Sequence, residues 1–181
     1  MNCNIVKLQK ILLPPGGKMD NIINIRHELK QVMFFLGALS SSLETFYGKG
    51  TNGTVYREGK KIAKSYSEGF KTDNIVQAVD MSKKILTDNG FLWKLDLWKQ
   101  NSQSDYFYKD KDGNTCVKIV FRDCMIRQSL FNYGHEQKGS LCYIMYGFFS
   151  GLTEQILDKK SELKIIHAGP NACLKELIIK G

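Results

Sequence analysis

The stretch "SLCYIMYGFFSGLTEQILDKKSELKIIHAGPNACLKELII", residues 140–179, decides the fold because it joins a strongly apolar segment to two shorter apolar runs. From residue 141 to about 158, apolar residues occur on nearly every side of a helical projection, which predicts a helix buried on most of its surface. Ser140 precedes this helix and is expected to cap it. Gly147 and Gly151 lie four residues apart, so they leave a narrow strip where another backbone can approach closely.

The two runs that follow predict a closing hairpin. Residues 163–168 and 173–179 flank a Gly-Pro-Asn turn, and Cys173 opens the last strand. Upstream, "FLWKLDLW" at residues 91–98 alternates with a period of two, as a half-buried strand does. The segment "DYFYKDKDGNTCVKIVFRDC", residues 105–124, predicts two strands joined at an Asp-Gly turn, because this dipeptide tolerates positive φ.

Three helical patterns precede these strands. They run over residues 24–47, over residues 54 to about 68, and from Thr72 or Asp73, either of which is a good N-cap, to about 89. Gly48, Gly50 and Gly53 are expected to end the first helix. The order of elements predicts an α+β fold: N-terminal helices packed against a twisted antiparallel sheet of about four to five strands, with a buried helix before the C-terminal hairpin.

Length and composition favour one folded domain. Of the 181 residues, 43% are hydrophobic and 24% charged, as in folded globular chains. A Pro-Pro-Gly-Gly cluster marks residues 1–20 as an N-terminal extension and residues 21–181 as a single domain. No apolar run is long enough for a membrane span, and no secretory signal pattern is seen, so a cytoplasmic location is expected.

The net charge and the cysteine positions limit the kinds of partner that are expected. The formal net charge is +8, but the lysines are scattered without an arginine-rich run, so nucleic acid is not expected as a partner of this chain alone. Five cysteines at irregular positions do not suggest a disulfide framework, which leaves free thiols or metal ligands.

The last sixty residues resemble the 4-vinyl reductase domain, in the form of a small stand-alone archaeal or bacterial protein. This domain shares its fold with the small subunits of the Golgi transport-tethering complex. The resemblance is carried by a strand that ends in cysteine, by a helix of the form Cys-x4-Gly-x3-Gly, and by a Glu-x6-Gly-x3-Cys hairpin. These are "VKIVFRDC", then Cys142, Gly147 and Gly151, then Glu162, Gly169 and Cys173.

This resemblance implies a homodimer with an interior pocket for an apolar small molecule. It also implies a structural zinc ion held by four residues, whose positions here are Cys142, Glu162, Ile165 and Cys173. Isoleucine cannot coordinate a metal, and a closed zinc site needs four ligands. Cys124, at a strand end, or His167, two residues after Ile165, is the expected stand-in, and without one of them the site is expected to be empty.

The function expected from this resemblance is noncatalytic binding of a small hydrophobic molecule, hydrocarbon-like or aromatic, as a sensor or carrier. Phe34, Phe35, Ile144 and Phe148 are the expected lining residues, chosen for size and helix position. The alternatives are an assembly subunit of the transport-tethering type and a reductase-associated protein of tetrapyrrole metabolism. No Gly-x-Gly-x-x-Gly follows a strand and no catalytic triad spacing is present, so no catalytic residue is predicted.

Overall fold

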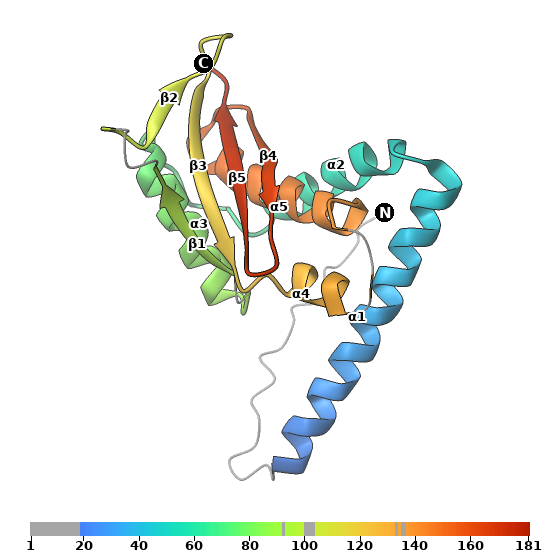
Figure 1. Ribbon diagram of the computed structural model, residues 1–181. Helices are drawn as coiled ribbons and strands as arrows, with labels where there is room; N and C mark the ends of the chain where they lie inside the picture. Colours follow the sequence, from blue (N-terminus) through green and yellow to red (C-terminus); the bar gives the residue numbers. More distant parts are fainter. Residues whose placement is uncertain (1–18, 92, 100–103, 133, 135–136) are drawn as a thin grey trace, which may run out of the picture.

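Figure 1 presents the computed structural model of the chain, which describes residues 19–91, 93–99, 104–132, 134 and 137–181. Side chains are described from residue 27 onward, except at positions 125 and 128. The predicted extension at residues 1–20 lies almost wholly outside this part. The helices are α1 (Met19–Tyr47), α2 (Gly50–Lys64), α3 (Ile75–Asp88), α4 (Met125–Asn132) and α5 (Ser140–Leu157). The strands are β1 (Lys94–Trp98), β2 (Phe107–Lys109), β3 (Thr115–Arg122), β4 (Ser161–Ala168) and β5 (Ala172–Ile179).

The strands form one antiparallel sheet in which β3 is central. β1 and β2 pair with one edge of β3, β5 pairs with the other edge, and β4 lies beyond β5. The predicted fold class is confirmed: helices precede the sheet in the chain, and α5 comes directly before the β4–β5 hairpin. No helix in the described part of the chain combines the length and apolar character needed to cross a bilayer.

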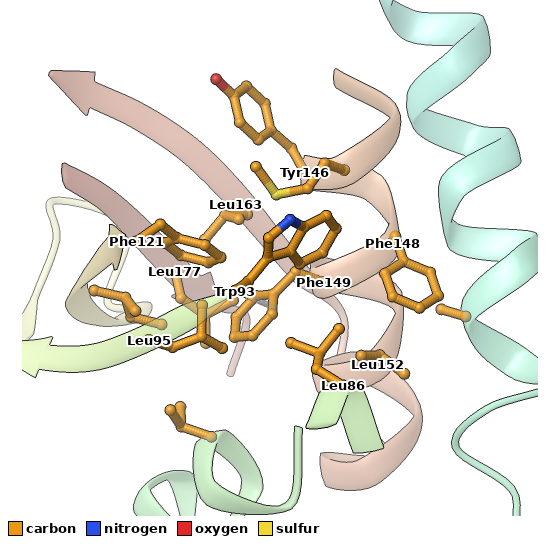
Figure 2. Packing of buried hydrophobic residues seen from close by; sticks show 14 of the residues in the cluster. Leu86, Trp93, Leu95, Phe121, Tyr146, Phe148, Phe149, Leu152, Leu163 and Leu177 are labelled. Carbon is orange, nitrogen blue, oxygen red and sulfur yellow. The ribbon is translucent and has the colours of Figure 1, made fainter. Parts of the chain in front are cut away.

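Helix α5 forms the centre of the structure, with the sheet on one side and α2 on the other (Figure 1). In the core, the ring centroids of Phe121 on β3 and Phe149 on α5 lie 5.2 Å apart, edge to face. Figure 2 shows these rings surrounded by the leucines of α3, α5 and the sheet. Because the sheet covers α5 on one side and α2 covers it on the other, the helix carries apolar residues on nearly all sides.

The predicted close backbone approach at α5 is confirmed, and α2 is the helix that makes it. A Cβ atom added at Gly147 would lie 2.0 Å from the carbonyl oxygen of Tyr56. At Gly151 it would lie 2.7 Å from Cβ of Ala63, and α2 contributes its own glycine, Gly59. Both helices therefore lack side chains where they meet, which lets their backbones come into contact.

The predicted helix boundaries on either side of α2 differ from the structure. Gly50 and Gly53 lie inside α2 and do not end α1, because a tight turn at Gly48, with φ of 61°, already separates the helices. The N-cap of α3 is Asn74, not Thr72 or Asp73. Its side chain accepts hydrogen bonds from the amides of Val76 and Gln77.

The start of α5 also differs, and it explains how α1 is held. Gly139 is the N-cap and Ser140 is already helical, so the predicted Ser140 cap was wrong. The cap is supplied from α1: Glu44 Oε1 accepts hydrogen bonds from the Ser140 amide (2.6 Å) and hydroxyl (2.7 Å). Burial alone raises the pKa of Glu44, but hydrogen bonds from Ser140 and Ser40 outweigh it, so the pKa lies below its ordinary value. A carboxylate at a helix N-terminus is also favoured by the helix dipole.

Candidate functional site

A cavity of about 460 Å³ opens between α2, α5 and β4. We call it the tyrosine cleft because three tyrosines from two helices line it. Its lining residues are Gly53, Tyr56, Tyr143, Tyr146, Glu162, Leu163, Lys164 and Ile165. The lining is mainly apolar with a few polar groups, and the volume lies within the range typical of small-molecule sites.

Local structure fixes the tyrosines in the cleft. Tyr143 and Tyr146 lie three residues apart on α5, so they share one helix face, and their ring centroids are 5.3 Å apart. Tyr56 comes from α2; its hydroxyl donates to Ser150 Oγ (2.9 Å) and accepts from the amide of Leu163 (3.3 Å). One side chain thus ties α2, α5 and β4 together. Burial raises the pKa of Tyr56 above its ordinary value, so the hydroxyl stays protonated at neutral pH.

Beneath the cleft lies a fully buried lysine, Lys175 on β5. Its Nζ donates to Met145 Sδ at 3.2 Å and lies 3.8 Å from the ring centroid of Phe121. The ring centroid of Tyr146 is 4.6 Å away on the other side. Burial lowers the pKa of Lys175 from 10.5 to about 8, because the charged ammonium is poorly solvated there.

Three buried cysteines surround this amine. Cys124, Cys142 and Cys173 all lie close enough to act electrostatically on Lys175. Burial raises the pKa of both Cys142 and Cys173, so these two thiols stay neutral near pH 7. Figure 2 shows Tyr146 at one end of the core, with its hydroxyl directed away from Phe149. The space between α5 and β5 thus holds sulfur atoms, an amine and aromatic rings.

The residues that the resemblance implied for zinc do not form a metal site here. Among the residues that the structure describes, no three His, Cys, Asp or Glu side chains are placed to hold one ion. Glu162 lines the cleft and is partly exposed, whereas Cys142 and Cys173 are buried. The buried ammonium of Lys175 also opposes a dication beside the thiols. The donors present therefore do not fit zinc.

The prediction that His167 shares a face with Ile165 is wrong. Ile165 pairs with Lys175 across the hairpin, but His167 pairs with Leu174, because a β-bulge shifts the register between them. The extra residue reverses the alternation of side chains, so His167 is exposed on the opposite face. It cannot stand in for Ile165, whereas Cys124, the other expected stand-in, does lie near the buried thiols.

The four expected pocket residues lie in three different places, none of which is the tyrosine cleft. Phe34 and Phe35 are 44% and 68% exposed on α1, where they line an open, mainly apolar hollow of about 590 Å³. Ile144 faces a small groove between α1, α2 and α5. Phe148 is buried in the core, where its ring stacks on Phe91 at 5.3 Å. Their contact with a ligand stays a prediction.

A buried polar atom at Trp93 lacks a partner. The indole Nε1 of Trp93 is buried without a hydrogen-bond partner in the described part of the chain. The ring lies among Phe91 and Phe148, with centroids 5.2 and 6.3 Å away. An unpaired donor in an apolar interior is costly, so it marks a second place where a ligand oxygen or a water would be favourable.

A different cavity, of about 370 Å³, is lined by polar residues of α1 that include Ser40 and Glu44. These side chains are already engaged with Ser140 at the start of α5. Because these polar side chains hold α1 and α5 together, the fold itself explains why they line this cavity.

Comparison with known proteins gives a fold relationship. No protein-family model matches the sequence, and no curated protein matches it either. Among solved structures, the chain is similar to the phenol-responsive sensory domain of the transcription activator PoxR, determined with phenol. The TM-score is 0.54 at 15% sequence identity, over 82% of this chain and 74% of that one. An identity this low establishes a shared fold only.

Sequence reasoning missed Tyr56, Tyr143, Tyr146 and Lys175. The signal for Lys175 was present: Cys173, Leu177 and Ile179 are inward-facing positions of one strand, and period-two alternation puts Lys175 on the same side. Tyr143 and Tyr146 gave no comparable signal, because nearly every position of α5 is apolar or aromatic.

Proposed function

We propose that this chain binds a small aromatic molecule in the tyrosine cleft and acts as a sensor or carrier without catalysing a reaction. The observation that carries the proposal is a cavity of about 460 Å³ lined by three tyrosines and two aliphatic residues. The similarity in fold to a domain that responds to phenol supports the same class of ligand.

The cleft suits an aromatic ring with one polar substituent. Offset and edge-to-face contacts between rings contribute about 0.5–1.5 kcal/mol beyond simple burial, and Tyr143 presents its ring to the cavity. The Tyr143 hydroxyl has no hydrogen-bond partner among the described residues, so it is free to bond to a ligand hydroxyl. Glu162, which also lines the cavity, offers an acceptor.

Ligand binding is tested by comparing phenol with cyclohexanol, which keeps the hydroxyl and ring size but lacks the aromatic face. We expect phenol to raise the melting temperature and to bind in calorimetry, and cyclohexanol to bind more weakly. Tyr143→Ala is expected to weaken phenol binding about tenfold, by loss of a ring contact worth about 1.4 kcal/mol. Tyr106→Ala, which removes a tyrosine outside the cleft, is the matched control.

The interior at Trp93 is the competing location. If phenol accepts a hydrogen bond from Trp93 Nε1, Trp93→Phe weakens binding and Tyr143→Ala leaves it unchanged. The opposite pattern supports the tyrosine cleft. Equal binding of phenol and cyclohexanol by all variants would contradict an aromatic site.

We further propose that the active form is a homodimer joined through α1. Six apolar side chains recur on α1 at alternating three- and four-residue steps, the a and d positions of a coiled-coil heptad. They are Leu29, Val32, Leu36, Leu39, Leu43 and Phe46, with exposed fractions between 36% and 85%. Figure 1 shows the first half of α1 projecting away from the sheet. Among the α1 side chains from residue 27 onward, the buried positions are Gly37 and Ser40, so the fold leaves much of the apolar stripe exposed.

The area of this stripe is compatible with a second copy of the chain. If each of the six side chains buries on the order of 100 Å² of surface, the two stripes together bury about 1,200 Å². This area is at the lower end of the range for specific interfaces. The groove that borders the stripe adds Leu141 and Ile144 of α5 and Val55 of α2. A helix from a second copy therefore meets apolar surface on more than one element.

Light scattering during size-exclusion chromatography tests the homodimer. Val32→Glu places a charge in the stripe and is expected to give a monomer. Gln31→Glu places the same charge one position away, outside the a and d positions, and is expected to leave the dimer intact. A wild-type chain that stays monomeric at every concentration contradicts the dimer, as does stoichiometric binding of a different protein to the stripe.

A further inference from the structure

Lys175 is not explained by the needs of the fold. Its ammonium has no carboxylate within reach in the part of the chain that the structure describes, and its contacts are a thioether and two aromatic rings. Cation–π contacts offset only part of the free-energy cost of burying a charged lysine. Leucine or methionine would fill this position at less cost, so the needs of the fold do not account for the amine.

A single layer of side chains separates Lys175 from the tyrosine cleft. Ile165 lies directly opposite Lys175 across the hairpin, so the two side chains share the inner face of the sheet. Ile165 and Tyr146 both line the cleft, and the Tyr146 ring is also in contact with Lys175 Nζ. The β-bulge that follows Ile165 interrupts the hairpin ladder at this point. The wall between cleft and amine is therefore built from two side chains beside an irregular strand.

We propose that Lys175 captures an aromatic aldehyde bound in the tyrosine cleft as a covalent imine, an inference that rests on the proposed function. The unprotonated amine attacks the carbonyl carbon, and a carbon–nitrogen bond forms. The carbonyl oxygen leaves as water, carrying the two amine protons, so one amine and one aldehyde give one imine and one water. No oxidant, reductant or metal is needed, and the step is reversible by hydrolysis.

The surroundings of Lys175 favour this reaction. No carboxylate among the described residues pairs with Lys175, so no ion pair holds the amine in its charged form. Phe121, Met145 and Tyr146 exclude water from the amine, which slows hydrolysis of the imine once formed. Lys175 has no exposed surface, so Ile165 or Tyr146 must turn aside before the aldehyde arrives. Capture is accordingly expected to be slower than reversible binding in the cleft.

Reductive trapping tests the proposal. The full chain is incubated with 4-hydroxybenzaldehyde and sodium cyanoborohydride, and peptides are mapped by mass spectrometry. We expect one hydroxybenzyl group, on Lys175. Excess 4-hydroxybenzyl alcohol, which fits the same site but cannot condense, is expected to protect Lys175. Ile165→Ala is expected to increase the labelling rate several-fold, because it thins the wall in front of the amine.

Lys164 is the internal control, since it lines the cleft and is exposed. Labelling mainly on Lys164, or spread over the exposed lysines, overturns the proposal. Lys175→Met should abolish the label and still bind the alcohol; if that variant does not fold, protection of wild-type Lys175 by the alcohol gives the same information. If aldehyde and alcohol both bind but no adduct forms, covalent capture is wrong and the proposed function stands. If neither binds, the proposed function fails as well.

Discussion

The contact between α2 and α5 makes a sharp prediction about Gly59. This glycine lies in the interior of α2, and a Cβ atom placed on it would be 2.1 Å from the carbonyl oxygen of Ile144. It would also be 2.7 Å from the amide nitrogen of Phe148. Both neighbours are backbone atoms of a buried helix, so no flexible side chain can move out of the way. Gly59→Ala therefore forces the two helices apart by about 1 Å, a large displacement in a close-packed core.

The magnitude follows from two opposing effects. Overpacking of a core costs typically 1–3 kcal/mol, and the upper end applies where the obstruction is backbone. Replacing a helical glycine by alanine returns about 1 kcal/mol through helix propensity. The net loss expected for Gly59→Ala is about 2 kcal/mol, or roughly 6 °C in melting temperature for a chain of this size.

Gly53→Ala is the matched control, because Gly53 lies in the same helix and a Cβ atom there would have no neighbour within 4 Å. It is expected to stabilise the chain by up to about 1 kcal/mol. Urea and thermal unfolding followed by circular dichroism measure both variants. If Gly59→Ala proves as stable as Gly53→Ala, the helices do not approach as closely as the structure has them, and the walls of the tyrosine cleft are misplaced as well.

Three further predictions concern charge and metal. Glu44→Gln should lower stability at neutral pH, by about 1 kcal/mol for a helix cap, and urea unfolding across pH should show this. Because the folded pKa of Glu44 lies below 4.5, the difference from wild type should disappear as pH falls through that lowered pKa; a constant difference would contradict the charged cap. Lys175→Met should stabilise the chain at pH 7 by on the order of 3 kcal/mol. Burial lowers the pKa of Lys175 from 10.5 to about 8, so the charged amine destabilises the folded state, and this destabilisation is greatest below pH 8. The gain should shrink as pH rises from 8 to 10.5, and a variant less stable than wild type at pH 7 would refute this. A strong chelator should leave the melting temperature unchanged and elemental analysis should find no stoichiometric zinc, because the donors do not converge; a bound ion would refute that geometry.

Parts of the fold that depend on local pattern could be predicted from the sequence. Strong apolar periodicity identified α5 to within a residue or two, and the spacing of Gly147 and Gly151 indicated its close contact. The identity of the partner helix could not be inferred in the same way, since it depends on tertiary packing with Gly59. Helix caps were missed for a related reason: Ser140 is capped by Glu44, which is 96 residues away in sequence.

The candidate site was harder to predict because amphipathic patterns do not reveal which surface an apolar stripe meets. Phe34 and Phe35 belong to a helix whose apolar stripe faces away from the domain, so their size and position did not place them in the cleft. Tyr56 and Tyr143 line the same cavity only because α2 packs on α5, which no local pattern encodes.

The β-bulge in the closing hairpin determines what chemistry this interior can support. If β4 alternated regularly through this point, with no bulge, His167 would lie on the face of Ile165, and an imidazole would join the buried thiols. With it, His167 points outward, and the inner face beside Cys173 carries Ile165 and Lys175 instead. A zinc ion would need four converging donors, whereas the hairpin places the ammonium group of Lys175 at this position. The bulge thus turns His167 outward and leaves Lys175 as the buried amine behind the cleft wall.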